Sequence, residues 1–348
     1  MPDLIDHTLY IRGLRHVKHT VFCVDEGQKQ YFDPMSRSYV GYSSGQQVKR
    51  SLIDRMLGAL GAPRAEMTFR KEENKQGGIK TKEVFSDCDP RHLDLLVGGW
   101  MRAVRGESTI KRRSPLSVSA LTPLHGTLTT TTEEVLTVDR RDDPADRHTI
   151  AVVDRNGDSV DDVDAFFAER DRVATRHQFT DKQRNKRLTG LFEYVVAVDL
   201  TRLFAVAKRV QDPELADDVR DALQDAGWPE DDDAFYLPNS DRERLIPALA
   251  RALIEWRVTS NQQRTFSLQN NLATVITRHA GQAANAIYVT QEDERATPHV
   301  EAIDGVSLYL TNEARALFDE GPFAADANQQ AIDELTDAIQ TYSDALPS

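Results

Sequence analysis

The range from Leu191 to Leu200 constrains the fold of this chain more than any other part of its sequence. Large hydrophobic side chains recur there at every second residue, a pattern that predicts a strand with one buried face. Such a strand needs neighbouring strands and a layer of side chains that covers its hydrophobic face. The residues expected on that face are Phe192, Tyr194, Val196, Val198 and Leu200.

An amphipathic helix near the N-terminus is the second clear element. Ser43 or Ser44 can cap its first turn, hydrophobic residues from Val48 to Leu60 recur at helical spacing, and Gly61 can end it. The polar side of this helix carries Gln46, Lys49 and Arg50.

The order of the elements predicts an α+β fold. A small sheet covered by helices, as in the ferredoxin-like (RRM-like) fold, fits it. Ser240 and Glu243 have the spacing of a capping box. The other expected elements are strands at Leu9–Leu14 and Leu116–Leu121, helices at Pro213–Ala226, Ser240–Trp256 and Asn328–Leu346, a loop at 24–42, a mobile basic insertion at 64–89 and a polar excursion at 122–187.

The charge distribution bears on the class of partner. The formal net charge of −13 argues by itself against nucleic acid, because Lys and Arg neutralise phosphates. Residues 1–115 nevertheless carry 20 Lys and Arg against 14 Asp and Glu, whereas residues 116–348 carry 23 against 42. A basic part and an acidic part are typical of a binding surface with a solvated opposite side.

Several classes of protein are not expected. No run of about 18 apolar residues is present, so we expect no membrane span and no membrane partner. The first residues lack the basic and apolar segments of a signal peptide, and Cys23 and Cys88 do not suggest a disulfide framework or a zinc site. These features predict a cytoplasmic protein.

Motifs for catalysis or cofactor binding are absent from the sequence. It contains no Walker loop, no dinucleotide fingerprint, no Gly-x-Ser-x-Gly elbow and no His-x-x-x-His or His-Glu-x-x-His spacing. We therefore expect a protein that is not an enzyme and that needs no cofactor and no metal.

Three segments together resemble one protein family. Tyr42–Ser51 is similar to the Ser-Gly-Gln-x-x-(Lys/Arg)-Arg start of the first helix in CRISPR backbone subunits. Asp94–Met101 and Lys111–Ser119 are similar to the family's Asp-Leu-Phe-Gly-x-Met and Arg-x-Ser-Pro-Leu-x-Val-Ser pair, and Gly190–Leu200 is similar to its later core strand. A weaker similarity lies at Ser260–Arg264. The chain thus resembles the RAMP-type, CRISPR RNA-binding backbone subunits of Cascade complexes, and within them the DevR-type autoregulator group.

This resemblance implies a palm with ferredoxin-like topology, inserted fingers and thumb subdomains, and added C-terminal helices. The palm would comprise 1–61, 111–121 and 188–348, the fingers 62–110 and the thumb 122–187. Copies of the chain would stack along a CRISPR RNA into a helical filament and present the guide to target nucleic acid. The partners implied are CRISPR RNA, target nucleic acid through the guide, further copies of the chain and other Cascade subunits.

The resemblance also implies where RNA would bind. Free N–H groups and the positive end of the helix dipole at the first helix make an anion site, Gly45 would let a phosphate come close, and Lys49 and Arg50 would add charge-assisted bonds. Such contacts hold the backbone and leave base edges free. The expected RNA-binding residues are Arg12, Ser44, Gly45, Gln46, Lys49, Arg50, Lys111, Arg112, Arg113, Lys182, Arg184, Lys186, Asn261 and Arg264.

Two other readings stay open at this point. Related backbone subunits that cut RNA use an acidic residue in a loop, and Asp25, Glu26 and Asp33 lie in the predicted loop 24–42. A metal-dependent ribonuclease of the same superfamily is therefore one alternative. The acidic, helical C-terminal half suggests the other, a protein-interaction or regulatory module.

Overall fold

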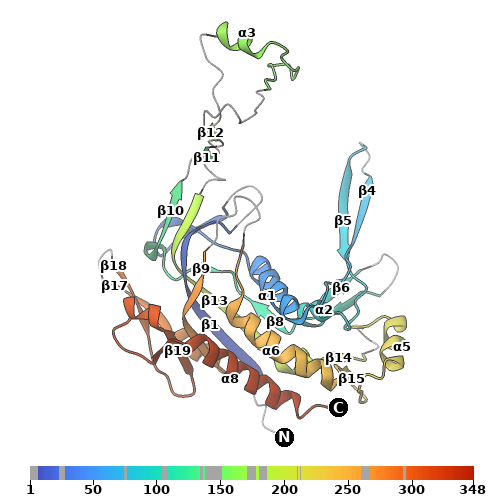
Figure 1. Cartoon of the computed structure of the whole chain (residues 1–348). Coiled ribbons are helices and arrows are strands. Elements are labelled where there is room, and N and C mark those ends of the chain that lie inside the picture. Colours follow the sequence, from blue (N-terminus) through green and yellow to red (C-terminus); the bar gives the residue numbers. More distant parts are fainter. Residues whose placement is uncertain are drawn as a thin grey trace.

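The fold is built on one long central strand and its neighbours (Figure 1). The computed structural model describes residues 7–22, 28–73, 77–103, 108–133, 136–137, 151–170, 178–179, 186–209, 211, 213–259, 267–292 and 295–348.

Four antiparallel strands and two helices form the core of the molecule. Strand β1 (Thr8–Thr20) lies between β13 (Lys186–Asp199) and β16 (Asn270–Thr277), and β8 (Leu116–Val118) pairs with the far edge of β13. Helix α1 (Gly45–Leu60) follows β1 in the chain, and helix α6 (Asn239–Glu255) follows β13. The spatial order β8-β13-β1-β16 with this connectivity is ferredoxin-like. The predicted α+β fold is confirmed.

Short strands extend this sheet at both edges. The outer edge of β13 pairs in turn with β8, β9 (Thr122–Pro123) and β10 (Thr129–Glu133). At the other edge, β16 pairs with β19 (Ser307–Thr311), which in turn pairs in parallel with β20 (Phe323–Ala324).

The two faces of the sheet are covered unequally. Helices α1, α6 and α8 (Ala327–Ser343) lie over one face, as Figure 1 shows, and odd-numbered β1 residues with even-numbered β13 residues pack beneath them. The other face carries a smaller cluster near Leu14 and Val275, under α7 (Ala280–Asn285) and the hairpin of β17 (Ile287–Glu292) and β18 (Arg295–Val300). Part of this second face, over β13 and β8, remains open.

Helix α1 forms where the sequence predicts it. The Ser44 hydroxyl accepts a hydrogen bond from the Gln47 N–H, which satisfies one of the unpaired donors of the first turn. Val48, Leu52 and Met56 are fully buried on its inner side. The helix ends at Gly61, whose φ of 63° lies in the left-handed region that favours glycine.

The remaining elements are short and lie in the connections. Between α1 and β8, β4 and β5 form a hairpin that projects from the body of the molecule in Figure 1, and β6 pairs with β7. Their bounds, with the other elements, are β4 (Thr68–Glu73), β5 (Ile79–Phe85), α2 (Leu93–Gly98), β6 (Trp100–Arg102), β7 (Ile110–Arg112), η1 (Gly126–Leu128), β11 (Leu136–Thr137), α3 (Val163–Ala168), β12 (Gln178–Phe179), α4 (Leu200–Leu203), β14 (Ala205–Ala207), α5 (Asp217–Asp225), β15 (Ala234–Tyr236) and η2 (Asn312–Ala316).

Three expectations about local structure were wrong. The loop predicted at 24–42 contains a hairpin, β2 (Gln30–Asp33) with β3 (Ser38–Gly41), on either side of the turn signal at Asp33. The insertion predicted at 64–89 contains the β4–β5 hairpin. The capping box at Ser240 does not form, because α6 already begins at Asn239. The Asn239 side chain, in place of the Ser240 backbone, donates to Glu243.

Strand β16 was missed altogether, although it belongs to the core. Its residues from Asn271 to Thr277 are buried on both sides of the strand, so no alternation of polar and hydrophobic residues marks it in the sequence. Only the surrounding layers show that this range is a strand.

Candidate nucleic-acid interface

The start of α1 offers unpaired backbone donors at the surface. Gln46 is exposed and Gly45 is half-buried, and neither of their N–H groups donates to another residue of the described ranges. These donors lie at the positive end of a 16-residue helix, where an anion is stabilised. The predicted position of the anion site is therefore accessible.

Gly45 has a different role from the one expected. A Cβ on this residue would lie 2.9 Å from the Val118 carbonyl oxygen and 3.2 Å from the Ser119 carbonyl oxygen. The missing side chain thus lets the first turn of α1 pack against the end of β8. It does not make room for a phosphate.

The side-chain amides of Gln28, which is buried, and Gln47, which is half-buried, hold the segments that lead into α1. The Gln47 side chain donates to the Phe22 carbonyl and accepts from the Ser43 hydroxyl. The Gln28 side chain accepts from the Phe22 N–H at 2.9 Å and donates to the carbonyls of Lys29 and Tyr42. The end of β1, the base of the β2–β3 hairpin and the first turn of α1 are therefore held together.

Lys49 is turned inward. Its Nζ donates to the Gly98 carbonyl at 2.8 Å and to the Ser114 hydroxyl at 2.6 Å. Burial, with the nearby positive charge of Arg112, lowers its pKa from the ordinary 10.5 to about 8. Lys49 thus joins α1 to α2 and to the turn before β8, which corrects the expected phosphate contact. Arg50 is exposed and, among the described residues, makes only a loose ion pair with Asp54, at 3.5 Å.

The three basic residues before β8 divide by burial. Arg112 is buried and donates to the carbonyls of Leu96, Arg202 and Ala205, and burial lowers its pKa to about 10 although Glu214 opposes this effect. The structure therefore corrects the expectation for Arg112, which cannot reach a phosphate. The side chains of Lys111 and Arg113 point the other way and are exposed.

An open groove of about 570 Å³ lies on the second face of the sheet. Its floor is formed by Tyr10, Val195 and Ala197, one wall by Ser117–Ser119 of the β8 edge and the other by residues of α7. Val118 and Ser119 also support Gly45, so the groove adjoins the start of α1. Alternation in the sequence could have placed Tyr10 on this face, but nothing local marked the groove.

Arg12 lines this groove but is already engaged. Its guanidinium pairs with Glu193 at 2.5 Å and donates to the carbonyls of Ala284 at 2.6 Å and Ile287 at 2.7 Å. Only 9% of the residue is exposed. Arg12 therefore attaches α7 to the sheet, which corrects the expectation that it contacts RNA directly.

Of the five remaining predicted residues, one lies in β13 and four lie in ranges that the structure does not describe. Lys186 donates to the Gln30 side chain at 2.9 Å and so connects β13 to the β2–β3 hairpin. Lys182, Arg184, Asn261 and Arg264 lie outside the described residues.

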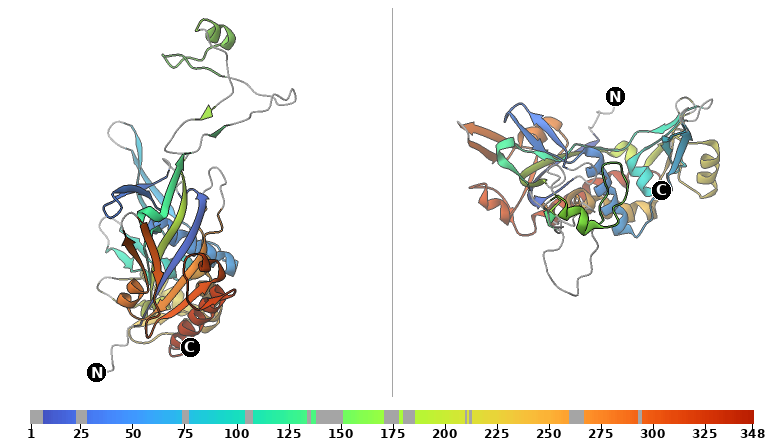
Figure 2. Two further views of the ribbon diagram at one scale, coloured as in Figure 1. Left: turned by 90° about the vertical axis from the view of Figure 1, so that its left-hand side faces the viewer. Right: turned by 90° about the horizontal axis from the view of Figure 1, so that it is seen from above.

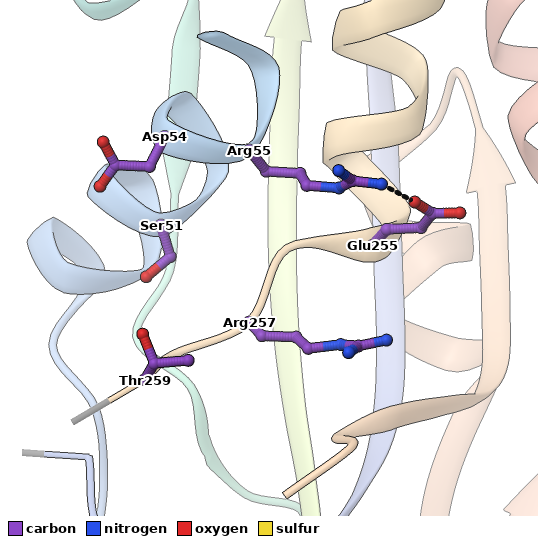
Figure 3. Close-up of a pocket in the computed structure, with 6 residues that line it drawn as sticks. All are labelled: Ser51, Asp54, Arg55, Glu255, Arg257 and Thr259. Carbon is purple, nitrogen blue, oxygen red and sulfur yellow. Dashed lines mark hydrogen bonds and ion pairs between the residues drawn. The ribbon is translucent and has the colours of Figure 1, made fainter. Parts of the chain in front are cut away.

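A second pocket, of about 500 Å³, lies on the other side of α1 (Figure 3). Arg55 reaches across it to Glu255, at 2.5 Å, and Glu255 also accepts from Arg251 at 2.9 Å. The lining carries two carboxylates, and Figure 3 shows one of them, Glu255, paired with Arg55, so this pocket is less suited to an anion than the start of α1. The lining residues are Ser51, Asp54, Arg55, Glu255, Arg257 and Thr259.

The candidates for nuclease chemistry do not form a site within the described ranges. Asp33 accepts from the N–H groups of Met35 and Ser36 and from the Ser36 hydroxyl, at 2.6 Å. Burial by itself would raise the pKa of the Asp33 carboxyl. These hydrogen bonds outweigh burial and lower the pKa below its ordinary value. Asp25 and Glu26 lie outside the described residues, and no group of three metal-ligating side chains occurs in the part that is described.

Neither cysteine was expected to belong to a disulfide framework or a zinc site. Cys88 is fully buried, and burial raises the pKa of its thiol above the ordinary value, which disfavours the reactive thiolate. Cys23 lies outside the described residues. None of the helices in the described ranges is long and apolar enough to cross a lipid bilayer.

Comparisons with known proteins find similarity in structure only. No family model and no curated protein matches the sequence. A solved chain described as "CRISPR RNA-guided surveillance complex, pre-nicking" is 11% identical with a TM-score of 0.45, covering 96% of this chain and 89% of that one. Another, described as "CRISPR RNA-guided surveillance complex", is 12% identical with a TM-score of 0.46, covering 95% of this chain and 99% of that one.

Proposed function

We propose that this chain is a non-catalytic backbone subunit of a type I CRISPR surveillance complex of the Cascade type. In this proposal it belongs to the RAMP-type RNA-binding subunits, near the DevR-type group. Copies of it polymerise along the CRISPR RNA, hold the sugar-phosphate chain and present the bases for pairing with target nucleic acid.

One observation carries the proposal: the separate segments that resemble the family meet in space. Lys49, in the first segment, donates to Gly98 and Ser114, in the two parts of the second. The second segment joins the third along the β8–β13 pairing and through Ser119, whose N–H donates to the Val195 carbonyl at 2.9 Å and whose hydroxyl accepts from the Val195 N–H at 2.8 Å. Segments that are far apart in the chain are thus brought together at the start of α1 and the edge of β8.

The chemistry of this surface suits a sugar-phosphate chain. The N–H groups of Gly45 and Gln46 donate to a phosphate, and Arg50 and Arg113 supply exposed positive charge nearby. The groove beside β8 accepts the sugar or base that follows. None of these groups reads a base edge, so binding is independent of sequence, as a carrier of many different guides requires.

The proposal assigns no catalytic residue. Asp33 is the only acidic candidate of the predicted loop within the described residues, and its carboxylate is engaged by three donors of its own turn. A side chain in that position organises a turn, and among the residues that the structure describes Asp33 belongs to no group of three metal-ligating side chains.

Binding of fluorescent single-stranded RNA tests the proposal. We expect Arg50→Glu to weaken binding about tenfold, because it removes a charge-assisted phosphate contact and places a carboxylate beside the anion site. The slope of log affinity against log salt should also fall by about one. The wild-type protein should assemble with RNA into particles larger than the free chain.

Arg244→Glu is the matched control. Arg244 is 65% exposed and 3.7 Å from Asp241, whereas Arg50 is 66% exposed and 3.5 Å from Asp54. The two substitutions change the net charge equally, so only Arg50→Glu should weaken RNA binding. Equal losses, or a wild-type protein that stays RNA-free and monomeric at every concentration, would refute the proposal.

A further inference from the structure

The β2–β3 hairpin presents two aromatic side chains to solvent. Phe32 and Tyr39 are directly opposite each other in the strand register, and their ring centroids lie 5.6 Å apart. They are 52% and 70% exposed. Met35, in the turn between the two strands, is 74% exposed, so this short hairpin presents three large apolar side chains to solvent. Such surfaces mark binding sites more often than isolated exposed residues do.

The opposite side of the hairpin is anchored to the rest of the molecule. Val40 is buried there, and the Tyr31 ring lies edge-on to Tyr42 with centroids 5.5 Å apart. In Figure 2 the blue hairpin stands beside β10, which it contacts through β3. On the side that carries the rings, only the base is attached: Gly41 packs against Leu188 and Gln30 accepts from Lys186, whereas Phe32 and Tyr39 remain exposed.

The hairpin is also rigid at its tip. The Asp33 carboxylate binds two N–H groups and one hydroxyl of the turn, and Arg37 follows in the left-handed region with φ of 51°. Gln28 and Lys186 tie down its base. The two rings are thus held in place before any ligand binds, which reduces the ordering cost of binding.

Two observations favour a nucleic-acid strand as the ligand. The hairpin precedes α1 directly in the chain, with Tyr42, Ser43 and Ser44 between Gly41 and Gly45, so one continuous segment carries the rings and the proposed phosphate site. Arg37 is exposed and forms no ion pair with another described residue, whereas the Asp33 carboxylate is turned into its own turn. Exposed rings beside an unneutralised arginine are the combination on which bases of single strands stack.

We propose that Phe32 and Tyr39 form a stacking platform for unpaired bases of the RNA strand whose phosphates bind at the start of α1. This inference rests on the proposed function and adds a second kind of contact to it. Stacking engages the faces of bases and not their edges, so it tolerates any guide sequence. It also persists in high salt, where phosphate contacts weaken.

The test replaces the rings and keeps the apolar character. In the double variant Phe32→Leu with Tyr39→Leu, affinity for single-stranded RNA in about 0.5 M salt should fall at least about tenfold, because two stacked bases are lost. Fluorescence quenching of 2-aminopurine in the bound RNA should be lost as well. The exchange Phe32→Tyr with Tyr39→Phe keeps both rings and should bind within about twofold of wild type.

A matched control comes from another hairpin. Tyr288, in β17, is 40% exposed and stacks on His299 with centroids 5.1 Å apart. Tyr288→Leu should leave RNA affinity unchanged. Phe32 and Tyr39 face solvent, so the melting temperature of the double leucine variant should match that of wild type.

The outcomes separate this inference from the proposed function. If wild-type protein binds no RNA, both are overturned. If wild-type binds and Arg50→Glu weakens binding, but the double leucine variant binds like wild type, only the stacking platform is overturned. It is overturned too if leucine serves as well as the rings, or if the leucine variant loses self-association without RNA, which would make the surface a contact between copies of the chain.

Discussion

The two faces of the central sheet hold arginine in different ways, and β1 shows both within four residues. On the face covered by α1, α6 and α8, Arg15 is fully buried: its Nε donates to Asn271 at 2.6 Å, and its guanidinium lies 3.8 Å from the Trp256 ring centroid. On the open face, Arg12 pairs with Glu193 at the groove and binds carbonyls at the end of α7. Arg15 therefore stabilises the interior, and Arg12 holds α7, which forms one wall of the groove, against the sheet.

This difference shows how the molecule separates stability from binding. No carboxylate of the described residues forms an ion pair with Arg15, and burial lowers its pKa, although contact with Tyr194 opposes this effect. The planar guanidinium is tolerated there because it is weakly hydrated, stacks on rings and has backbone carbonyls to bind. The stability of the covered face therefore depends on each of its buried contacts. On the open face, polar side chains lie next to surface that solvent can reach.

The largest effect is expected from truncating the two arginines. Arg15→Ala should lower the free energy of unfolding by about 3–5 kcal/mol, because it leaves buried acceptors of Ile254, Trp256 and Asn271 unpaired and creates a cavity. Arg12→Ala should cost about 1–3 kcal/mol, since its site is closer to solvent. Urea denaturation of both variants measures the difference.

Arg15→Lys sharpens this comparison. Lysine keeps the charge but cannot form the planar, forked contacts, so the loss should approach that of Arg15→Ala. If Arg12→Ala proved the more destabilising of the two alanine variants, the contrast between the faces would be mistaken.

A smaller effect is expected where α1 reaches the rim of the groove. Gly45→Ala should lower the free energy of unfolding by about 1–3 kcal/mol, because its Cβ would collide with the backbone of Val118 and Ser119. Gly58→Ala, in the same helix, meets nothing within 4 Å and should stabilise the protein by about 0.5–1 kcal/mol. Thermal unfolding of the pair distinguishes packing from helix propensity, and the same sign for both would contradict the packing at Gly45.

The smallest effect concerns the pH dependence of stability at Lys49. Its pKa is about 8 in the folded protein against an ordinary 10.5, so between these values the unfolded chain binds more protons than the folded one. Stability from Lys49 should therefore rise as pH increases from about 8 towards 10. In Lys49→Met this rise should be smaller. Denaturant midpoints of wild type and Lys49→Met at pH 7.5 and 9.5 measure this rise. If the midpoint changed equally in the two proteins, burial would not lower the pKa of Lys49.

The candidate site could be predicted from the sequence in its position but not in its contacts. The start of α1 was found because Ser44, Gly45 and the hydrophobic stripe that follows are local signals. The engagement of Lys49 and Arg112 could not be found, because their acceptors, such as Gly98 and Ala205, lie far away in the chain. A basic residue has the same appearance in a sequence whether it faces a phosphate or a buried carbonyl.

The sequence by itself determined the elements whose signals repeat along the chain. The alternation at 192–198 placed β13, and the capped stripe up to Gly61 placed α1, because periodicity and caps depend on residues a few positions apart. Only the tertiary structure decided that β16 completes the sheet, that Arg12 and Arg15 are held on opposite faces, and that Phe32 and Tyr39 are exposed on the β2–β3 hairpin. Burial depends on which distant segments arrive on each side of a residue, and no local pattern records that.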